Sequence, residues 1–399
     1  MTVLVTDGEQ RAALATARSL IAAGFDVLVA SHQAHSLAGV SRGAKRVVVR
    51  ADPLAHPREY ADEIAVIARA RNVRLLMPVT DPSVEALLEH RGVLPQSAVL
   101  PFPDVATYRR ASDKVMMLDR ARDAGLDVPA SVLIASRGEM AAGEVPSLFP
   151  AVLKPRQSVV TLPDGSRRKL LVEFAETIDD YRRKAASLPD YAFPLLVQQR
   201  VRGPGEGMFL LRWDGRIVAQ FAHRRIREKP PAGGISVYRE SIAVPPDLAS
   251  ASRRLLDALD WRGVAMVECK RDEQTGRHVF MEVNGRLWGS LQLALDAGVD
   301  FPALLAQCAA GGHPDAVLDY RVGVRSRWFW GDVDHLYLRL RRSRARLHLD
   351  AKAPGRIAAV REFCSFWRSG DSEEIWRWRD PKPFLLETAR RLKLPGLSA

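Results

Sequence analysis

Apolar strands alternate with helices over the first hundred residues, and this alternation restricts the fold more than any other feature of the chain. Short apolar runs of strand character lie at residues 3–6, 26–30, 46–50 and 75–79. Apolar residues at helical spacing fill residues 9–23 and 56–71 between these strands, and residues 83–90 after the last of them. Because strands joined by helices of this length form βαβ units, we predict an α/β fold that begins with a Rossmann-like parallel sheet.

The turn after the first strand argues against one use of such a sheet. Asp7 and Gly8 stand where a Rossmann phosphate loop would lie, but the pattern G-x-G-x-x-G is absent. We therefore do not expect a dinucleotide cofactor in this part of the chain.

Length and cysteine content set broad limits. A chain of 399 residues is expected to form two to three domains. Its three cysteines match no zinc spacing, which favours buried thiols in a reducing compartment and hence a cytoplasmic protein. The first eight residues lack the features of a signal peptide, and no run of 18 apolar residues predicts a membrane span.

The sharpest chemical signal is a pair of apolar strands that carry polar residues at their ends. Residues 264–268 (VAMVE) and 279–284 (VFMEVN) are typical of adjacent antiparallel strands. Glu268, Glu282 and Asn284 could then converge on one face, since alternate residues of a strand share a face. Carboxylate and amide oxygens suit Mg²⁺ held together with nucleotide phosphates. The competing interpretation is a surface hairpin with ordinary acids.

Five motifs, in order along the chain, resemble those of the ATP-grasp superfamily. Residues 281–286 (MEVNGR) resemble its E-x-N-x-R signature, and Lys114 and Lys154 resemble its two ATP-binding lysines. Residues 197–201 (VQQRV) resemble the hinge between the two lobes that clasp ATP, and Glu206 resembles the acid that binds ribose. The resemblance implies an ATP-grasp fold that uses ATP and Mg²⁺, with Mn²⁺ as an alternative.

The same resemblance implies a division into three parts. Residues 1–103 would be a Rossmann-like domain that precedes the ATP-grasp domain of residues 104–310. Within the latter, a small lid lobe would span roughly residues 125–197 and a larger lobe residues 198–310. Residues 311–399 would then be a basic C-terminal extension.

Individual roles also follow from the resemblance. Lys154 would neutralise phosphate oxygens, assisted by Lys114 from a helical stretch over residues 104–125. Arg286 would hold the transferring phosphoryl group or the acceptor carboxylate, so Arg286 and Lys154 are the candidate catalytic residues. The other candidate ATP-binding residues are Gln198, Gln199, Val201 and Glu206. The candidate metal ligands are Glu268, Glu282 and Asn284.

A narrower resemblance concerns the substrate. Residues 223–225 (HRR), 233–239 (GGISVYR) and 288–294 (WGSLQLA) resemble predicted ATP-dependent carboligases related to biotin carboxylase and carbamoyl-phosphate synthetase. Candidate substrate ligands from these segments are His223, Arg225, Arg239 and Ser290.

The implied reaction is the ATP-dependent ligation of a carboxylate to an amine, or to another nucleophile, through an acyl phosphate. ADP and phosphate would be released, and the partners would be small carboxylate and amine substrates, with a homodimer as the expected assembly. Two alternatives stay open: a bicarbonate-activating enzyme of carboxylase or carbamoyl-phosphate type, and a non-catalytic nucleotide sensor or membrane-surface scaffold.

The lid loop departs from the family pattern. Residues 156–170 hold one glycine, Gly165, where a glycine-rich loop would let backbone N–H groups approach phosphate. We expect hydroxyl groups of Ser158 and Ser166, together with one of three arginines, to cover the phosphates instead. These are Arg156, Arg167 and Arg168.

Most of the excess positive charge lies at the end of the chain. Residues 321–399 hold 18 Lys and Arg against nine Asp and Glu, and five of the eight Trp. This composition is typical of a segment that packs on the body of the enzyme, of one that binds an anionic membrane surface, or of one that binds nucleic acid. No nucleic-acid-binding signature supports the last of these, so membrane association is the main alternative to packing.

Overall fold

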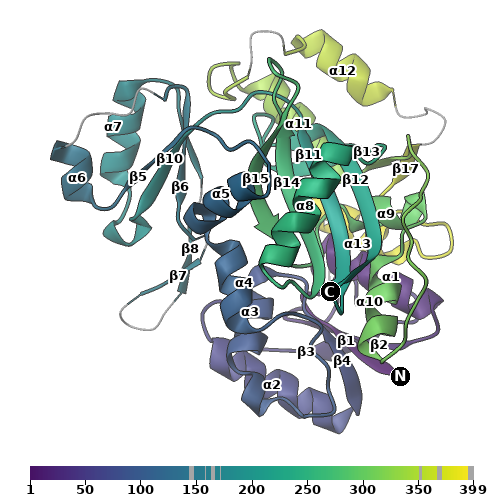
Figure 1. Ribbon diagram of the computed structural model, residues 1–399. Helices are drawn as coiled ribbons and strands as arrows, with labels where there is room; N and C mark the ends of the chain where they lie inside the picture. The colour runs from purple at the N-terminus through teal and green to yellow at the C-terminus, as the bar shows by residue number, and fades with distance from the viewer. Residues whose placement is uncertain are drawn as a thin grey trace.

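The computed structural model describes residues 1–142, 148–157, 159–162, 167–170, 172–349, 353–365 and 371–393. Three sheets organise these residues, and a two-stranded hairpin adds to them. In Figure 1 the N-terminal sheet lies at the bottom, a small four-stranded sheet at the left and a seven-stranded sheet in the centre.

The N-terminal sheet confirms the predicted parallel βαβ arrangement. Its strand order is β3-β2-β1-β4, and every neighbouring pair is parallel. Three of the four strands are almost completely buried at their centres, as at Leu4, whereas the edge strand β3 is mostly exposed. The elements are β1 (Thr2–Val5), α1 (Arg11–Ala22), β2 (Asp26–Ser31), β3 (Lys45–Val48), α2 (Pro57–Ala70), β4 (Val73–Met77), α3 (Asp81–Glu89) and η1 (Arg91–Val93).

The stretch predicted as one helix over residues 104–125 is two helices, α4 (Val105–Ser112) and α5 (Lys114–Asp123). Asp113 separates them because its carboxylate accepts hydrogen bonds from the N–H groups of Val115 at 3.0 Å and Met116 at 3.1 Å. This cap starts a new helix at Lys114.

The small sheet carries the predicted hinge. Its order is β5-β10-β6-β9, and all its pairs are antiparallel. Its own core, which includes Leu153, Tyr181 and Val197, separates it from the other two sheets. The elements of this lobe are β5 (Ser131–Ile134), α6 (Arg137–Ala142), β6 (Ala151–Pro155), the hairpin β7 (Val159–Thr161) and β8 (Arg167–Lys169), β9 (Glu173–Ala175), α7 (Ile178–Ser187), η2 (Asp190–Ala192) and β10 (Leu195–Gln199).

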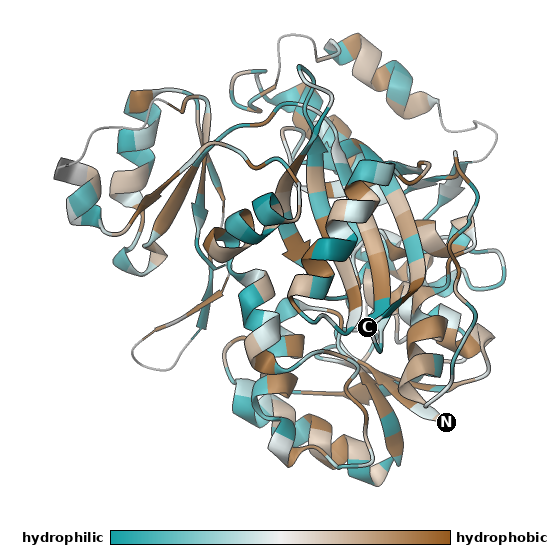
Figure 2. Cartoon of the chain, in the orientation of Figure 1, coloured by the Kyte–Doolittle hydropathy of each residue, from teal (hydrophilic) through white to brown (hydrophobic). Residues whose placement is uncertain are grey.

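The large sheet has the order β15-β14-β11-β12-β13-β16-β17. On one face Met208 and Leu210 pack with residues of α8 (Pro246–Ala258), and on the other Phe209 and Leu211 pack with α1, α9 (Leu291–Ala297) and α10 (Phe301–Ala309). Figure 2 shows the apolar residues concentrated in these central strands. The first five strands are β11 (Gly205–Trp213), β12 (Arg216–Lys229), β13 (Ile235–Ser241), β14 (Gly263–Arg271) and β15 (His278–Asn284).

The C-terminal residues complete this sheet. Strands β16 (Arg325–Arg327) and β17 (Asp371–Glu373) add to its edge beside β13. Asp380 accepts a hydrogen bond at 2.9 Å from Arg18 of the N-terminal domain. The remaining helices are α11 (Phe329–Arg341), α12 (Arg356–Cys364) and α13 (Lys382–Leu392).

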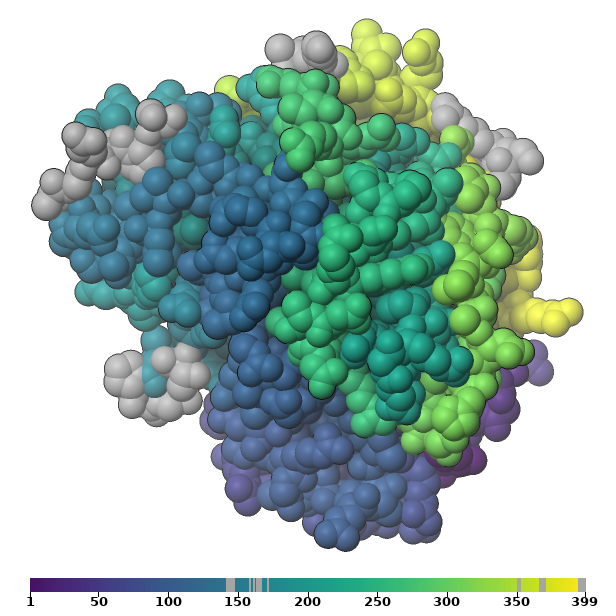
Figure 3. Space-filling model, viewed as in Figure 1, coloured from purple at the N-terminus to yellow at the C-terminus, as the bar shows by residue number. Residues whose placement is uncertain are grey.

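Of the three interpretations of the basic segment, its described residues therefore show packing on the body. The indole Nε1 atoms of Trp328 and Trp330 donate to Glu387 at 2.8 Å and to Thr388 at 2.9 Å. Trp378 is 87% exposed, and Trp367 lies outside the described residues. Among the helices that the structure describes, none has the length and hydropathy needed to cross a membrane. The yellow C-terminal residues lie along the upper and right-hand edges of Figure 3.

Candidate active site

The strand register places the predicted acids side by side on one face of the large sheet. Glu282 of β15 lies opposite Glu268 of β14, and Glu268 lies opposite Gly207 of β11. Gly207 in turn lies opposite His223 of β12. Asn284 shares the face of Glu282, as the two-residue repeat of a strand requires.

Three cavities meet at Glu282, which lines all of them. The interlobe cleft, of about 560 Å³, lies between strands β6 and β10 of the small sheet and β14 and β15 of the large sheet, with Lys154 and Gln198 among its walls. The Lys114 pocket, of about 190 Å³, lies beside α5 and the lid hairpin. The Trp288 pocket, of about 170 Å³, lies beside the loop that follows β15.

Two lysines flank the acids. Lys154 lines the interlobe cleft, and Lys114 lines the pocket named after it together with Glu282 and Asn284. Burial lowers the pKa of Lys154 below its ordinary value; the charge of Glu282 opposes this effect and the charge of Lys114 adds to it. The positive charges of Lys154 and Lys114 repel each other when the site is empty. A bound polyanion such as a nucleotide phosphate would offset this repulsion.

The two carboxylates of Glu268 and Glu282 also repel each other, but with negative charge. Burial raises the pKa of Glu268 above its ordinary value, and the charge of Glu282 raises it further, while Arg225 at 2.6 Å opposes both. A cation between the two carboxylates would relieve this repulsion. Asn284 supplies a third oxygen donor, and its Nδ2 donates to Glu282 at 3.1 Å.

The donor set fits a hard divalent cation that also binds phosphate. No group of three or more His, Cys, Asp or Glu side chains able to hold a metal occurs in the described parts of the chain. Glu268, Glu282 and Asn284 therefore do not form a complete cage, and phosphate oxygens or water would have to supply the remaining ligands. This is the usual arrangement for Mg²⁺.

Arg286 is held between the acids and the N-terminal domain. Its Nε donates to Asp81 at 2.9 Å and its Nη2 donates to Asn284 Oδ1 at 3.2 Å. Tyr108 donates to the same Asp81 at 2.9 Å. Burial lowers the pKa of Arg286, but the Asp81 carboxylate more than offsets it, so the pKa lies above its ordinary value. The guanidinium is a permanent, oriented cation at the junction of the Lys114 and Trp288 pockets.

The predicted hinge residues Gln198, Gln199 and Val201 all line the interlobe cleft. Gln198 is buried, and its Nε2 donates to Ser131 Oγ at 3.0 Å, so its amide is held in one orientation. Val201 also lines a second hollow of about 330 Å³ behind the hinge.

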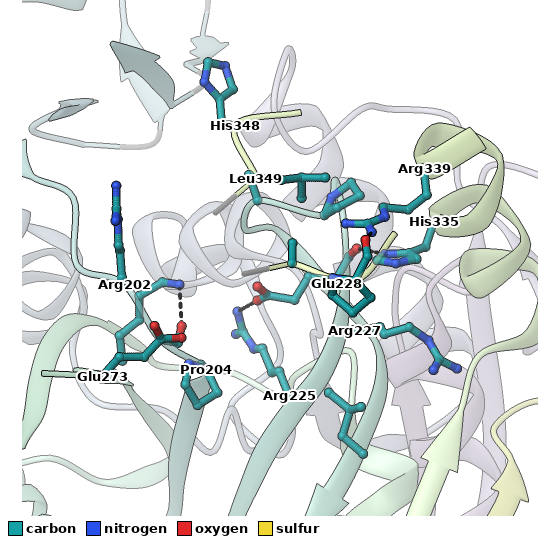
Figure 4. A pocket seen from close by; sticks show the side chains of 18 of the residues that line it. Arg202, Pro204, Arg225, Arg227, Glu228, Glu273, His335, Arg339, His348 and Leu349 are labelled. Carbon is teal, nitrogen blue, oxygen red and sulfur yellow. Dashed lines mark hydrogen bonds and ion pairs between the residues drawn. The ribbon is translucent and has the colours of Figure 1, made fainter. Parts of the chain in front are cut away.

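Figure 4 shows this second hollow, in which Arg225 and Glu228 of β12 point toward each other at 2.9 Å. His335 and Arg339 of α11 form the opposite wall. Arg225 and Glu228 also line the interlobe cleft, so the hollow extends the cleft to the C-terminal segment.

Glu206 does not lie with the other candidates. It faces the side of the sheet covered by α8, because its strand neighbours Gly205 and Gly207 occupy the cleft side. It is 2% exposed and contacts His278 Nε2 at 2.9 Å, while His278 Nδ1 contacts Asp247 at 2.9 Å. The hydrogen bond to Glu206 raises the pKa of His278, despite burial. The structure thus separates Glu206 from the cleft.

The four candidate substrate residues are divided. Arg225 and Ser290 line the Trp288 pocket. Arg239 is completely buried and forms an ion pair at 2.6 Å with Glu374 of the C-terminal segment, so it lines none of the three cavities. His223 is 1% exposed and lies edge-on to Phe209, with 4.7 Å between ring centroids.

His223 is also short of hydrogen-bond partners. Neither ring nitrogen has a partner among the described residues. Burial, together with the charges of Arg225 and Arg239, lowers the pKa of His223 well below its ordinary value, so the ring is neutral.

Two of the three lid arginines, Arg156 and Arg167, form ion pairs with acids. Arg156 forms an ion pair with Asp113 at 2.6 Å, and buried Arg167 pairs with Glu89. Neither lines the interlobe cleft, nor does Arg168, whereas Lys169 lines both this cleft and the Lys114 pocket. The proposed hydroxyl donors Ser158 and Ser166 lie outside the described residues.

Comparison with known proteins gives this geometry a context. Residues 193–330 match the family described as ATP-grasp in the biosynthetic pathway with Ter operon. A D-aspartate ligase of Enterococcus faecium (strain Aus0004) is 23% identical over 228 residues, which are 53% of this chain and 53% of that protein. The chain thus spans about half the length of this curated relative.

Solved structures extend the likeness over most of the chain. An L-amino acid ligase from Bacillus licheniformis has a TM-score of 0.58 at 14% identity, covering 77% of this chain and 73% of its own. An N5-carboxyaminoimidazole ribonucleotide synthetase in complex with ADP has a TM-score of 0.61 at 14% identity, covering 81% and 80%. A biotin carboxylase from Campylobacter jejuni has a TM-score of 0.61 at 14% identity, and the match covers 81% of this chain and 74% of that protein's chain.

Residues 193–330 thus match an ATP-grasp family, and the chain has the ATP-grasp fold. The cavity residues that the sequence-based candidates did not include are Arg11, Asp81 and Trp288, among others. A signal for the first two was present, because both follow strands of the parallel sheet, and ligand sites lie at the carboxyl ends of such strands. Trp288 follows the E-x-N-x-R motif by two positions, but nothing local shows that its indole turns toward the cavity.

Proposed function

We propose that this protein is an ATP-dependent ligase that joins a carboxylate to an amine through an acyl phosphate. One observation carries the proposal: Glu282 lies where a cleft with a lysine wall meets a small polar pocket beside Arg286. The cleft is large enough for a nucleotide, since ligand pockets of that class measure about 300–1,000 Å³. The smaller pocket suits a small substrate that lies beside the nucleotide phosphates.

In the first step a carboxylate oxygen of the substrate attacks the γ-phosphorus of ATP. The bond between this phosphorus and the β–γ bridging oxygen breaks, and ADP leaves with the bonding electrons. Lys154 and Lys114 offset the negative charge of the phosphates, and Arg286 holds the oxygens of the transferring group. Positioning and charge neutralisation are the protein's main contributions to such a transfer.

In the second step the amine nitrogen attacks the carbonyl carbon of the acyl phosphate. The carbon–oxygen bond to phosphate breaks, phosphate departs with the electron pair, and the nitrogen loses a proton. The product is an amide.

Glu268, Glu282 and Asn284 would hold Mg²⁺, or Mn²⁺, together with the β and γ phosphates. Such an ion neutralises charge on the phosphates and aligns them. The like-charge pair of Glu268 and Glu282 supports this assignment, because burial next to Glu282 already raises the pKa of Glu268.

The class of substrate is suggested by the relatives. Two of them are named D-aspartate ligase and L-amino acid ligase. We propose an amino acid as one of the two substrates, with a cytoplasmic location and small-molecule partners.

The test is ADP and phosphate release from ATP with a panel of D- and L-amino acids, alone and with added amines. ADP release that depends on an amino acid, and an amide product found by mass spectrometry, would support the proposal. Glu282→Gln should be inactive, whereas Glu59→Gln, an exposed acid of α2, should match the unmodified protein. ATP binding without turnover for any substrate would contradict the proposal, as would turnover that requires only bicarbonate.

A further inference from the structure

The Trp288 pocket combines an opening toward the proposed reaction centre with buried donors that have no partner in the part of the chain that the structure describes. Glu268, Glu282, Asn284 and Arg286 form its side toward the reaction centre. The indole of Trp288, 2% exposed, lies in its wall.

Three buried polar atoms of the pocket wall lack a hydrogen-bond partner among the described residues: Trp288 Nε1, Ser236 Oγ and Arg225 Nε. An unpaired buried donor destabilises the fold, so such groups are normally satisfied by a ligand or by water. Indole and guanidinium nitrogens can only donate, which means that the missing partner is an acceptor.

Positive charge at the same place specifies the acceptor further. Arg11, at the first position of α1, lines the Trp288 pocket from the N-terminal domain. Its Nη2 would lie 3.2 Å from a Cβ atom at Gly289, so the glycine leaves room for the guanidinium. Two cations, Arg11 and Arg286, and unpaired N–H donors together favour a carboxylate.

The C-terminal segment holds Arg11 in this place. Glu374, 3% exposed, accepts hydrogen bonds from Arg11 and, at 2.6 Å, from Arg239. The guanidinium of Arg11 also stacks on Trp328, 4.0 Å from the ring centroid. The basic segment therefore supplies an acid and an aromatic platform that orient a cavity residue 363 positions away in the sequence.

We propose that the Trp288 pocket binds the non-reacting α-carboxylate of the amino acid substrate, through Arg11, Trp288 Nε1 and Ser236 Oγ, and that Glu374 is a positioning residue for Arg11. This inference rests on the proposed ligase function. The carboxylate that is phosphorylated, or the amine that attacks, is a different group of the same amino acid. The pocket is smaller than the roughly 300 Å³ at which drug-sized sites begin, so the substrate is a small amino acid.

The test compares each amino acid with the amine that remains after loss of its α-carboxylate: aspartate with β-alanine, and alanine with ethylamine. Trp288→Phe keeps the ring and removes one donor. We expect it to raise the KM for the amino acid by about tenfold to hundredfold and to leave the KM for ATP unchanged. It should also reduce the preference for the amino acid over its decarboxylated partner.

Trp378→Phe is the matched control, since Trp378 is exposed and remote from the pocket wall. Glu374→Gln should raise the KM for the amino acid by about tenfold with kcat little changed. A purely structural role of Glu374 would instead lower the melting temperature without a selective change in KM. An unchanged preference in Trp288→Phe would overturn the proposal.

Failure of the ligase function is distinguishable from failure of this inference. If the unmodified protein releases no ADP with any amino acid, the proposed function fails, and calorimetric titration with the same D- and L-amino acids then tests the pocket. Binding that is weakened in Trp288→Phe but not in Trp378→Phe would support the carboxylate site. Equal binding by both variants, or no binding by the unmodified protein, would overturn it.

Discussion

Glu206 and Glu268 lie on neighbouring strands of one sheet, but on opposite faces and in opposite situations. Glu206 lies under α8 and pairs with His278, which also contacts Asp247. Glu268 faces a cavity, and the residue opposite it is another acid, Glu282.

The difference teaches how to separate a structural acid from a functional one in the same sheet. Burial alone does not distinguish them. A buried acid paired with a histidine stabilises the fold, whereas a buried acid beside a like charge is held at a cost that a bound cation offsets. Four predictions test this contrast.

The largest expected effect is on catalysis. Glu268→Gln should lower amino-acid-dependent ADP release by about 10²–10³-fold, because one oxygen donor of the proposed metal site is lost. The melting temperature should stay close to that of the unmodified protein, since the repulsion from Glu282 is removed along with the ion pair to Arg225. Full activity of this variant would remove Glu268 from the site.

The second effect is on stability. Glu206→Gln should lower the free energy of unfolding by roughly 2–3 kcal/mol, because it leaves His278 without its buried acid. Denaturant unfolding measures this change. The KM for ATP should not change at temperatures where the variant is folded, and an increase in that KM would return Glu206 to the nucleotide site.

A third buried acid, Glu387 of α13, tests how burial affects stability when the carboxylate lines none of the three cavities. Burial raises the pKa of Glu387 to about 7, and its carboxylate accepts from Trp328. A raised acid pKa means that the folded state is favoured while the group is protonated. The stability cost grows as pH rises from the unfolded pKa near 4.5 and is complete above about 7.

Glu387→Gln should therefore stabilise the protein at pH 8 by about 2 kcal/mol and have little effect at pH 5. Thermal unfolding at the two pH values checks this difference. Equal effects of the substitution at both pH values would show that ionisation of Glu387 plays no part.

The smallest effect concerns the pH dependence of the Glu206–His278 pair. The pKa of His278 is raised by Glu206, so its stabilising contribution is complete below the unfolded value of about 6.5 and is lost as pH rises through the folded value. The difference in unfolding free energy between the unmodified protein and Glu206→Gln should thus shrink by about 1 kcal/mol from pH 5.5 to pH 9. A constant difference would show that His278 stays neutral throughout.

Much of the fold and part of the site could be predicted from local patterns. The parallel sheet followed from apolar runs of strand length separated by helical segments. Glu282 and Asn284 were recognisable because polar residues two positions apart interrupt an apolar strand. The candidate ATP-binding residues Gln198 and Val201 were identified from their motif, and both line the cleft.

The failures have equally specific causes. Glu206 belongs to a motif that matches the family in order, but the face of a strand depends on where the strand begins, and a change of one residue reverses it. Arg239 lies in a matching segment as well, yet Glu374 occupies it from far along the chain. Arg156 and Arg167 were candidates for phosphate contacts in the sequence, but Asp113 and Glu89 pair with them in the fold.

By itself the sequence determined the α/β class, the strand on which the acids lie and the concentration of positive charge near the C-terminus, because periodicity and composition are local properties. Only the tertiary structure decided that Glu282 stands where three cavities meet and that Arg11 and Glu374 are partners. Such contacts join residues whose separation along the chain carries no information about distance. They exist because folding brings the start of the first helix against the residue that follows the last strand.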